Sequence, residues 1–368
     1  MTEPLSGPAE IARAGWRAAR QLGSAAERIA ALPSAEETAR AALHAAASEV
    51  RLVAPSGDDA ARFTAIREKI ATTTSSVFSD WMHASAETFH DGAAAETMNG
   101  PMAALIEGIK IVDDIQDDEE RCLAAEIGPA RAFAIALGTL GFALELTSEL
   151  PLKGTAWRAA ATAIGRGLRE TAIGQELESD DDAGFDAFWN MVDRKTGPLV
   201  ATALELGSLA AGADPAAPAA LTRLARPLGR ILQIGDDCND ALGAHASDWR
   251  SPQRNLVLRY TLSGPNAGEL TALLRDAANV EALHAAKRLL LRDGALAYAI
   301  HAQLVTVADL LEAVDALSLP NPAPFLHIVE QQRLECEGLL TLTGVDPELS
   351  RSLFTAPASP NPPSRCPS

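Results

Sequence analysis

The sequence of 368 residues has few aromatic and few basic residues. Aromatic side chains make up only 4% of it while alanine is abundant, and this composition favours helices over a β-sandwich. Acids outnumber lysine and arginine by 49 to 31, which gives a formal net charge of −18. We expect no nucleic-acid partner, because phosphate contacts require a basic face. The charge does not exclude an anionic substrate, since bound metal ions can reverse the local field.

Cysteines and long apolar runs are also scarce. Cys122, Cys238, Cys336 and Cys366 fit no zinc template and no disulfide framework, which indicates free thiols in a reducing compartment. The sequence lacks an uninterrupted apolar run of about 18 residues and a signal-peptide pattern near Met1. We therefore expect no membrane span and a cytoplasmic location.

Apolar residues recur throughout the sequence at spacings of three and four positions. With 47% hydrophobic residues it can bury a large core, and it has no short alternating runs typical of strands. We expect an all-α, single-domain helical bundle over residues 21–350, a flexible leader over 1–20 and a disordered, proline-rich tail over 351–368. The predicted helices are 24–50, 58–94, 100–123, 128–150, 153–178, 184–212, 215–243, 265–292, 294–316 and 323–342.

The first informative motif is an acidic cluster at the end of an apolar helical segment. Asp113 and Asp117 are four residues apart and share a helix face, and Asp114 and Asp118 form a second such pair. Like charges at this spacing destabilise a helix unless something offsets their repulsion. Hard oxygen ligands on a helix suit Mg²⁺, which keeps several waters and bridges to substrate phosphates. The plainer alternative is a solvated acidic helix end.

A second cluster follows another apolar helical run and argues against that alternative. Asp236, Asp237 and Asp240 repeat the same DDxxD spacing. Two such helices that face each other could clamp Mg²⁺ ions around a diphosphate.

Together with two shorter motifs, the clusters carry a family resemblance. The chain resembles the trans-isoprenyl diphosphate synthase (polyprenyl synthetase) family over about residues 60–345, because four motifs occur in the family's order and at similar spacing. These are Asp113–Asp118, Gly174–Glu178 (the family's GQxLD segment), Arg194–Gly197 (its KTG segment) and Gln233–Asp240. The resemblance implies an isoprenoid synthase fold, dependence on Mg²⁺ and a homodimer.

The resemblance also implies roles in ionising an allylic prenyl diphosphate, whose departing pyrophosphate Mg²⁺ would stabilise. Lys195 would bind the diphosphate, and Gln175 would contact a metal-bound water or support Lys195. Arg121 would contact pyrophosphate, or pair with Asp117 at i,i+4. The expected direct ligands are Asp113, Asp117 and Asp236, with Asp114, Asp118, Asp237 and Asp240 as further ligands or as groups that orient metal-bound water.

Gly108 and Ile109 lie about one turn before the first cluster, where side-chain bulk limits prenyl length in relatives. Gly108 would leave room for a chain of C15 or longer. The alternative is a close contact between helices at this glycine.

The chain departs from the family where a second diphosphate would bind. Arg67 and Lys69 flank Glu68 in place of a Gly-Lys-Arg segment, and the Arg-Arg-Gly-x-Pro after the first cluster is missing. Arg250 and Arg254 stand where lysines are usual and would substitute for them, so Arg254 is expected to bind diphosphate. Burying a second diphosphate without cationic partners is unfavourable. We therefore prefer cyclisation or rearrangement of one prenyl diphosphate, as in terpene synthases. The alternatives are condensation with isopentenyl diphosphate and a non-catalytic subunit of a heteromeric synthase.

Overall fold

A computed structural model describes residues 77–118, 122–152, 154–177, 184–214, 218–242, 249, 251–276 and 279–342. Within these ranges every regular element is a helix, so the all-α prediction is confirmed. The elements are α4 (Val77–Phe89), the 3₁₀ helix η1 (Gly92–Met98), α5 (Asn99–Gln116), α6 (Leu123–Ile127), α7 (Pro129–Ser148), α8 (Thr155–Leu177), α9 (Phe185–Lys195), α10 (Gly197–Ala210), α11 (Pro218–Leu242), the 3₁₀ helix η2 (Pro252–Arg254), α12 (Leu256–Leu262), α13 (Ala267–Leu274), α14 (Val280–Arg292), α15 (Ala295–Ala316) and α16 (Ala323–Leu342).

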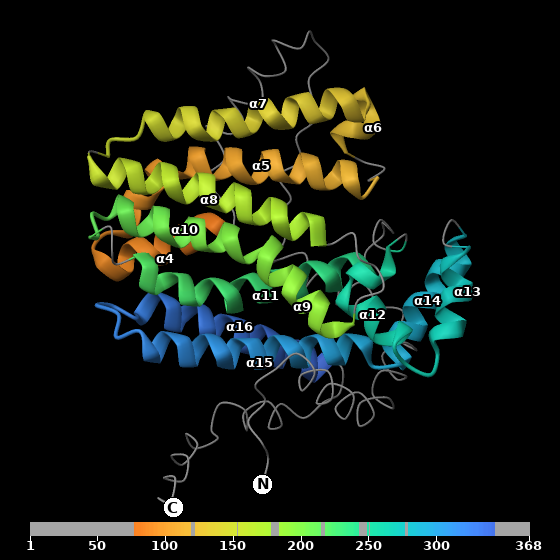
Figure 1. Ribbon diagram of the computed structural model, residues 1–368. Coiled ribbons are helices and arrows are strands. Elements are labelled where there is room, and N and C mark those ends of the chain that lie inside the picture. The colour runs from red at the N-terminus through yellow and green to blue at the C-terminus, as the bar shows by residue number, and fades with distance from the viewer. Residues whose placement is uncertain are drawn as a thin grey trace, which may run out of the picture.

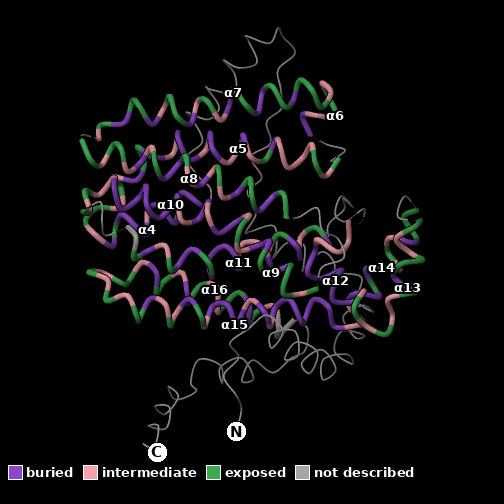
Figure 2. Tube along the Cα trace, in the orientation of Figure 1, coloured by how far each residue is buried: buried purple, intermediate pink, exposed green. Residues whose placement is uncertain are grey.

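The long helices stack in layers from α7 through α5, α8, α10 and α11 to α15 and α16 (Figure 1). Helix α10 is central: it packs against α4, α8 and α11, and nearly all of Leu199–Leu209 is buried (Figure 2). Two core clusters result. Helix α11 joins them, because Leu221–Ile231 belongs to the larger cluster and Ile234–Ala241 to the smaller one, which α9, α12, α14 and α15 complete.

Several predicted helix boundaries were wrong, and the reasons are local. The segment 184–212 is two helices that break at Thr196, because Pro198 in the first turn of α10 has no N–H for a continuous ladder. Helix α5 ends at Gln116, and Asp118 follows in the left-handed region with φ of 51°. The segment 265–292 is likewise two helices, α13 and α14, and α12 was not predicted. The leader 1–20, the segment 24–50 and the tail 351–368 lie outside the described residues.

Candidate active site

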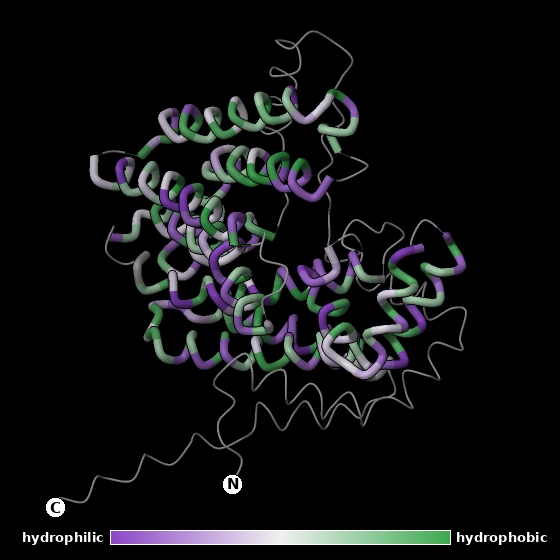
Figure 3. The backbone as a smooth tube through the Cα atoms, turned by 45° about the vertical axis from the view of Figure 1, so that its right-hand side comes forward, coloured by the Kyte–Doolittle hydropathy of each residue, from purple (hydrophilic) through white to green (hydrophobic). Residues whose placement is uncertain are grey.

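The C-terminal end of α5 carries the first aspartate cluster. The helix changes there from hydrophobic to hydrophilic residues (Figure 3). Asp113 and Asp114 lie in its last turn and Asp117 caps it. A helix C-terminus has a negative dipole end, so carboxylates at this point need nearby cations.

Asp113 contacts one cation and one neutral hydrogen-bond donor from other helices. Its Oδ1 atom lies 2.8 Å from Lys195 Nζ at the end of α9 and accepts a hydrogen bond of 2.6 Å from Gln175 Nε2 on α8. Burial acts to raise the pKa of Asp113, but the charge of Lys195 and both hydrogen bonds outweigh it, so the pKa lies below its usual value. The structure thus joins three of the four motifs around one ionised carboxylate.

The other carboxylates of this cluster also face cations. Lys110, one turn earlier on α5, lies 3.1 Å from Asp114 Oδ1. Arg254 NH1, at the end of η2, lies 3.0 Å from Asp117 Oδ1. Arg254 was expected near a diphosphate, and the structure brings it to the first cluster. Arg121, which was expected to contact pyrophosphate or to pair with Asp117, lies outside the described residues.

The second cluster is divided between two faces of α11. Asp236 and Asp240 are exposed, whereas Asp237 is only 2% exposed. The Oδ1 atom of Asp237 accepts from Gln233 Nε2 at 2.8 Å, and Oδ2 accepts from the backbone N–H of Leu256 at 2.7 Å. Asp237 therefore fixes the start of α12 against α11.

Two chains of contacts bring the clusters to the same end of the bundle. Thr196, next to Lys195, donates to Gln233 Oε1 at 3.2 Å, and Gln233 donates to Asp237. Arg254 contacts Asp117, and its neighbour Asn255 donates to the backbone oxygen of Asp237 at 2.8 Å.

The side chains at this end of the bundle supply ligands of the type that Mg²⁺ prefers, because they are carboxylate oxygens on two helices. Within the described ranges no group of three or more His, Cys, Asp or Glu side chains is already arranged around one metal position. Cations instead contact Asp113, Asp114 and Asp117. A bound metal ion would compete with these cations for the carboxylate oxygens.

Gly108 lies at a close helix contact. A Cβ added there would come within 2.6 Å of Leu140 Cγ on α7, and Ile109 packs on the larger core cluster. Of the two sequence interpretations of Gly108, the structure shows the helix contact.

Gly174 lies within a predicted motif but had no predicted role, and Lys110 was not among the predicted site residues. A Cβ on Gly174 would lie 2.3 Å from the backbone N of Lys195, so α8 and the end of α9 touch through their backbones. The signal for Lys110 was available, since it stands four residues before Asp114.

Replacing Asp237 by asparagine is expected to destabilise the metal-free protein by about 2 kcal/mol, since an amide cannot accept at both oxygen positions and a buried donor loses its partner. Replacing the exposed Asp236 by asparagine is the matched control and should leave metal-free stability within about 0.5 kcal/mol of the parent. Urea unfolding in EDTA measures both. Equal stability of the two variants would remove the structural role of Asp237.

A family model for polyprenyl synthetase matches residues 75–250. The (2E,6E)-farnesyl diphosphate synthase of Mycobacterium tuberculosis is 32% identical over 180 residues, which is 45% of this chain and 50% of the relative. The geranylfarnesyl diphosphate synthase of Aeropyrum pernix is 28% identical over 147 residues, which is 38% of this chain and 45% of the relative. The chain thus spans about half the length of the curated relatives it matches.

Solved structures with the same fold cover more of the chain. A geranylgeranyl pyrophosphate synthetase from Pyrococcus horikoshii gives a TM-score of 0.59 at 16% identity, covering 89% of this chain and 98% of its own. A polyprenyl synthetase from Streptomyces coelicolor gives 0.58 at 19% identity, covering 85% and 99%. These likenesses confirm the isoprenoid synthase fold. The family match over residues 75–250 and the partial sequence relatives support the resemblance to the trans-isoprenyl diphosphate synthase (polyprenyl synthetase) family.

Proposed function

We propose that the protein is a Mg²⁺-dependent prenyltransferase that condenses an allylic prenyl diphosphate with isopentenyl diphosphate. The observation that carries the proposal is the contact of Asp113 with Lys195 and Gln175, connected through Thr196 and Gln233 to the second aspartate cluster. The relatives that match part of the chain are named as farnesyl and geranylfarnesyl diphosphate synthases.

In this reaction the C1–O bond of the allylic diphosphate breaks and pyrophosphate leaves with the bonding electrons. Bound Mg²⁺ would supply Lewis-acid stabilisation of the charge on the departing oxygens. Asp113, Asp117 and Asp236 would hold it, with Asp114, Asp118 and Asp240 as further oxygen donors. Lys195 and Arg254 would bind diphosphate oxygens. Gln175 would orient the carboxylate of Asp113 relative to Lys195 through its hydrogen bond. The new bond joins C4 of isopentenyl diphosphate to C1, and a proton leaves C2.

Cyclisation of a single prenyl diphosphate, preferred on the sequence alone, receives no support from the named relatives. That hypothesis depended on Arg67, Glu68 and Lys69, which lie outside the described residues. It also depended on the stretch 120–124, of which 122–124 are described, and on Arg250 and Arg254 in place of lysines. The third hypothesis, a non-catalytic subunit, has against it that Asp113, Lys195 and Gln175 are present and in contact.

Product analysis separates the three hypotheses. Purified protein with Mg²⁺ and geranyl or farnesyl diphosphate, with and without isopentenyl diphosphate, is analysed by mass spectrometry. The proposal expects longer prenyl diphosphates only when both substrates are present. A hydrocarbon or terpene alcohol formed without isopentenyl diphosphate would support cyclisation instead, and no product in either case would support a non-catalytic subunit.

A second copy of the chain is proposed to cover the outer face of α7. Phe133, Leu137 and Leu144 form one stripe on this helix and are 48%, 56% and 52% exposed. By length and hydropathy, α7 and α15 could each cross a membrane, but the apolar window of α15 is 61% buried while that of α7 is 33% buried. Arg131 and Glu145 are also exposed on α7, and such charges favour a protein partner over lipid.

Replacing Leu137 by glutamate is expected to convert a dimer to a monomer, because a charge would be buried without a partner in the interface. Analytical ultracentrifugation measures the change. Leu334→Glu on α16 is the control, since Leu334 is similarly exposed at 53% but stands outside the stripe, and this variant should remain dimeric. A monomeric parent, or a Leu137→Glu variant that stays dimeric, would contradict the interface.

A further inference from the structure

Helix α9, which ends in Lys195, is held to α11 by a buried ion pair. Asp193 stands two residues before Lys195, and Arg230 stands six residues before Asp236. Arg230 donates from Nε to Asp193 Oδ1 at 2.6 Å and from NH2 to Oδ2 at 2.8 Å. This two-pronged geometry restrains direction as well as distance. We propose that the pair positions Lys195 relative to the second aspartate cluster and thereby sets the affinity of the site for diphosphate, an inference that rests on the proposed function.

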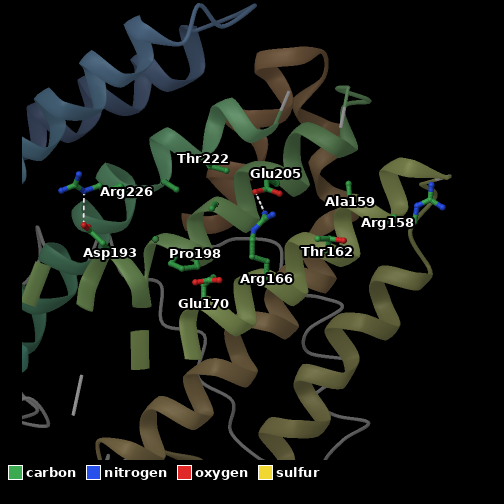
Figure 4. Close-up of a pocket in the computed structure, with 13 residues that line it drawn as sticks. Arg158, Ala159, Thr162, Arg166, Glu170, Asp193, Pro198, Glu205, Thr222 and Arg226 are labelled. Atoms are coloured by element: carbon green, nitrogen blue, oxygen red, sulfur yellow. Dashed lines mark hydrogen bonds and ion pairs between the residues drawn. The ribbon is translucent and has the colours of Figure 1, made fainter. Parts of the chain in front are cut away.

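Asp193 has two arginine partners, of which Arg230 is buried and Arg226 is exposed. The side chain of Arg230 is 4% exposed, and its guanidinium carbon lies 4.9 Å from the centre of the buried Trp189 ring on α9. Arg226 also contacts Asp193, at 3.1 Å, but is 60% exposed at the edge of a groove of about 670 Å³ (Figure 4). Because exposed pairs contribute little and buried pairs restrain strongly, Arg230 is the member that fixes α9.

The backbone around Lys195 leaves little freedom for compensating movement. Gly174 lies against the backbone of Arg194 and Lys195, and a Cβ on Gly229 of α11 would be 3.1 Å from the backbone N of Gly197. A shift of α9 against α11 would therefore carry Lys195 with it. Its Nζ atom, now 2.8 Å from Asp113, would move from the position at which it meets a diphosphate.

Another acid near Arg230 does not replace Asp193. Burial raises the pKa of Asp309 on α15, and Glu312 adds to this rise, while Arg230 and Arg226 only partly oppose it. Within the described part of the chain, Arg230 makes no hydrogen bond or ion pair with Asp309, whereas it donates two hydrogen bonds to Asp193.

A plain role in stability is the competing explanation. Replacing both charged partners by neutral groups of similar size often leaves stability unchanged, whereas removing one partner of a buried pair is strongly destabilising. The informative variant is therefore the double substitution Asp193→Asn with Arg230→Met. A second variant, Arg230→Lys, keeps the positive charge but cannot donate the two parallel hydrogen bonds of a guanidinium group. Arg226→Met is the matched control, because it removes the exposed contact of the same carboxylate.

Binding of inorganic pyrophosphate in the presence of Mg²⁺, measured by titration calorimetry, tests the proposal. We expect at least tenfold weaker binding for the double variant, at least threefold for Arg230→Lys, and parent affinity for Arg226→Met. In a Lys195→Met background the double substitution should cause no further loss, since it acts through Lys195.

Parent affinity in the folded double variant, or an undiminished loss in the Lys195→Met background, would overturn the proposal. If the double variant does not fold, Arg230→Lys decides: native helix content with parent affinity overturns it. Product formation by the parent is measured separately. A parent that binds pyrophosphate but forms no prenyl product defeats the proposed function and leaves this test intact.

Discussion

Asp113→Asn is expected to lower kcat/KM by at least about 10²-fold, because it removes the charge at the centre of the site while keeping an oxygen acceptor. The Oδ1 atom of Asp113 is the point where Lys195 and Gln175 meet. An asparagine can still accept both hydrogen bonds, so the fold of this region should persist. What is lost is a carboxylate that would hold Mg²⁺ and balance Lys195.

Steady-state kinetics with both substrates, alongside circular dichroism, measures this effect. Asp315→Asn is the control, since Asp315 is an exposed acid on α15 that has no part in the proposed site. It should keep the parent rate. An Asp113→Asn enzyme with more than half of the parent kcat/KM would contradict the metal assignment.

Lys195→Met should also lower kcat/KM by about 10²-fold, since it removes a positive charge that would bind the departing diphosphate. The lysine side chain is 15% exposed, so water would replace its charge poorly. Because Lys195 and Asp113 are in contact, the Asp113→Asn and Lys195→Met effects should combine to less than their product.

Arg292→Met is the control for this experiment, because it removes the exposed ion pair between Arg292 on α14 and Glu269 on α13. Kinetics of the single and combined variants provide the measurement. Strict multiplication of the two effects would mean that Lys195 and Asp113 act independently, contrary to their 2.8 Å contact.

The sequence predicted which residues meet at the site better than it predicted their geometry. Aspartate spacing and the Gly-Gln and Lys-Thr-Gly segments identified Asp113, Gln175 and Lys195, and the structure joins them. Periodicity gave most of the helices, because apolar spacing directly reports the buried face. It could not reveal that Asp237 faces inward, since this depends on a contact with a distant segment. The break at Thr196 was missed although Pro198, two residues later, signals it locally.

The sequence also could not predict which residues far apart in the chain are in contact. The ion pair of Arg254 with Asp117 joins residues far apart in the chain, and Gly108 faces Leu140 on another helix. Spacing along one helix reports only neighbours on that helix. The preference for cyclisation over elongation, which the named relatives do not support, depended on aligning loops whose register the sequence does not fix.

A crystal structure with Mg²⁺ and a bisphosphonate, which stands in for the allylic diphosphate, tests the central claim most directly. We expect metal ions between the bisphosphonate and the carboxylates of Asp113, Asp117 and Asp236, with Lys195 Nζ within hydrogen-bonding distance of a phosphonate oxygen. Metal ions bound elsewhere, or a bisphosphonate that contacts only one of the two aspartate clusters, would contradict the account.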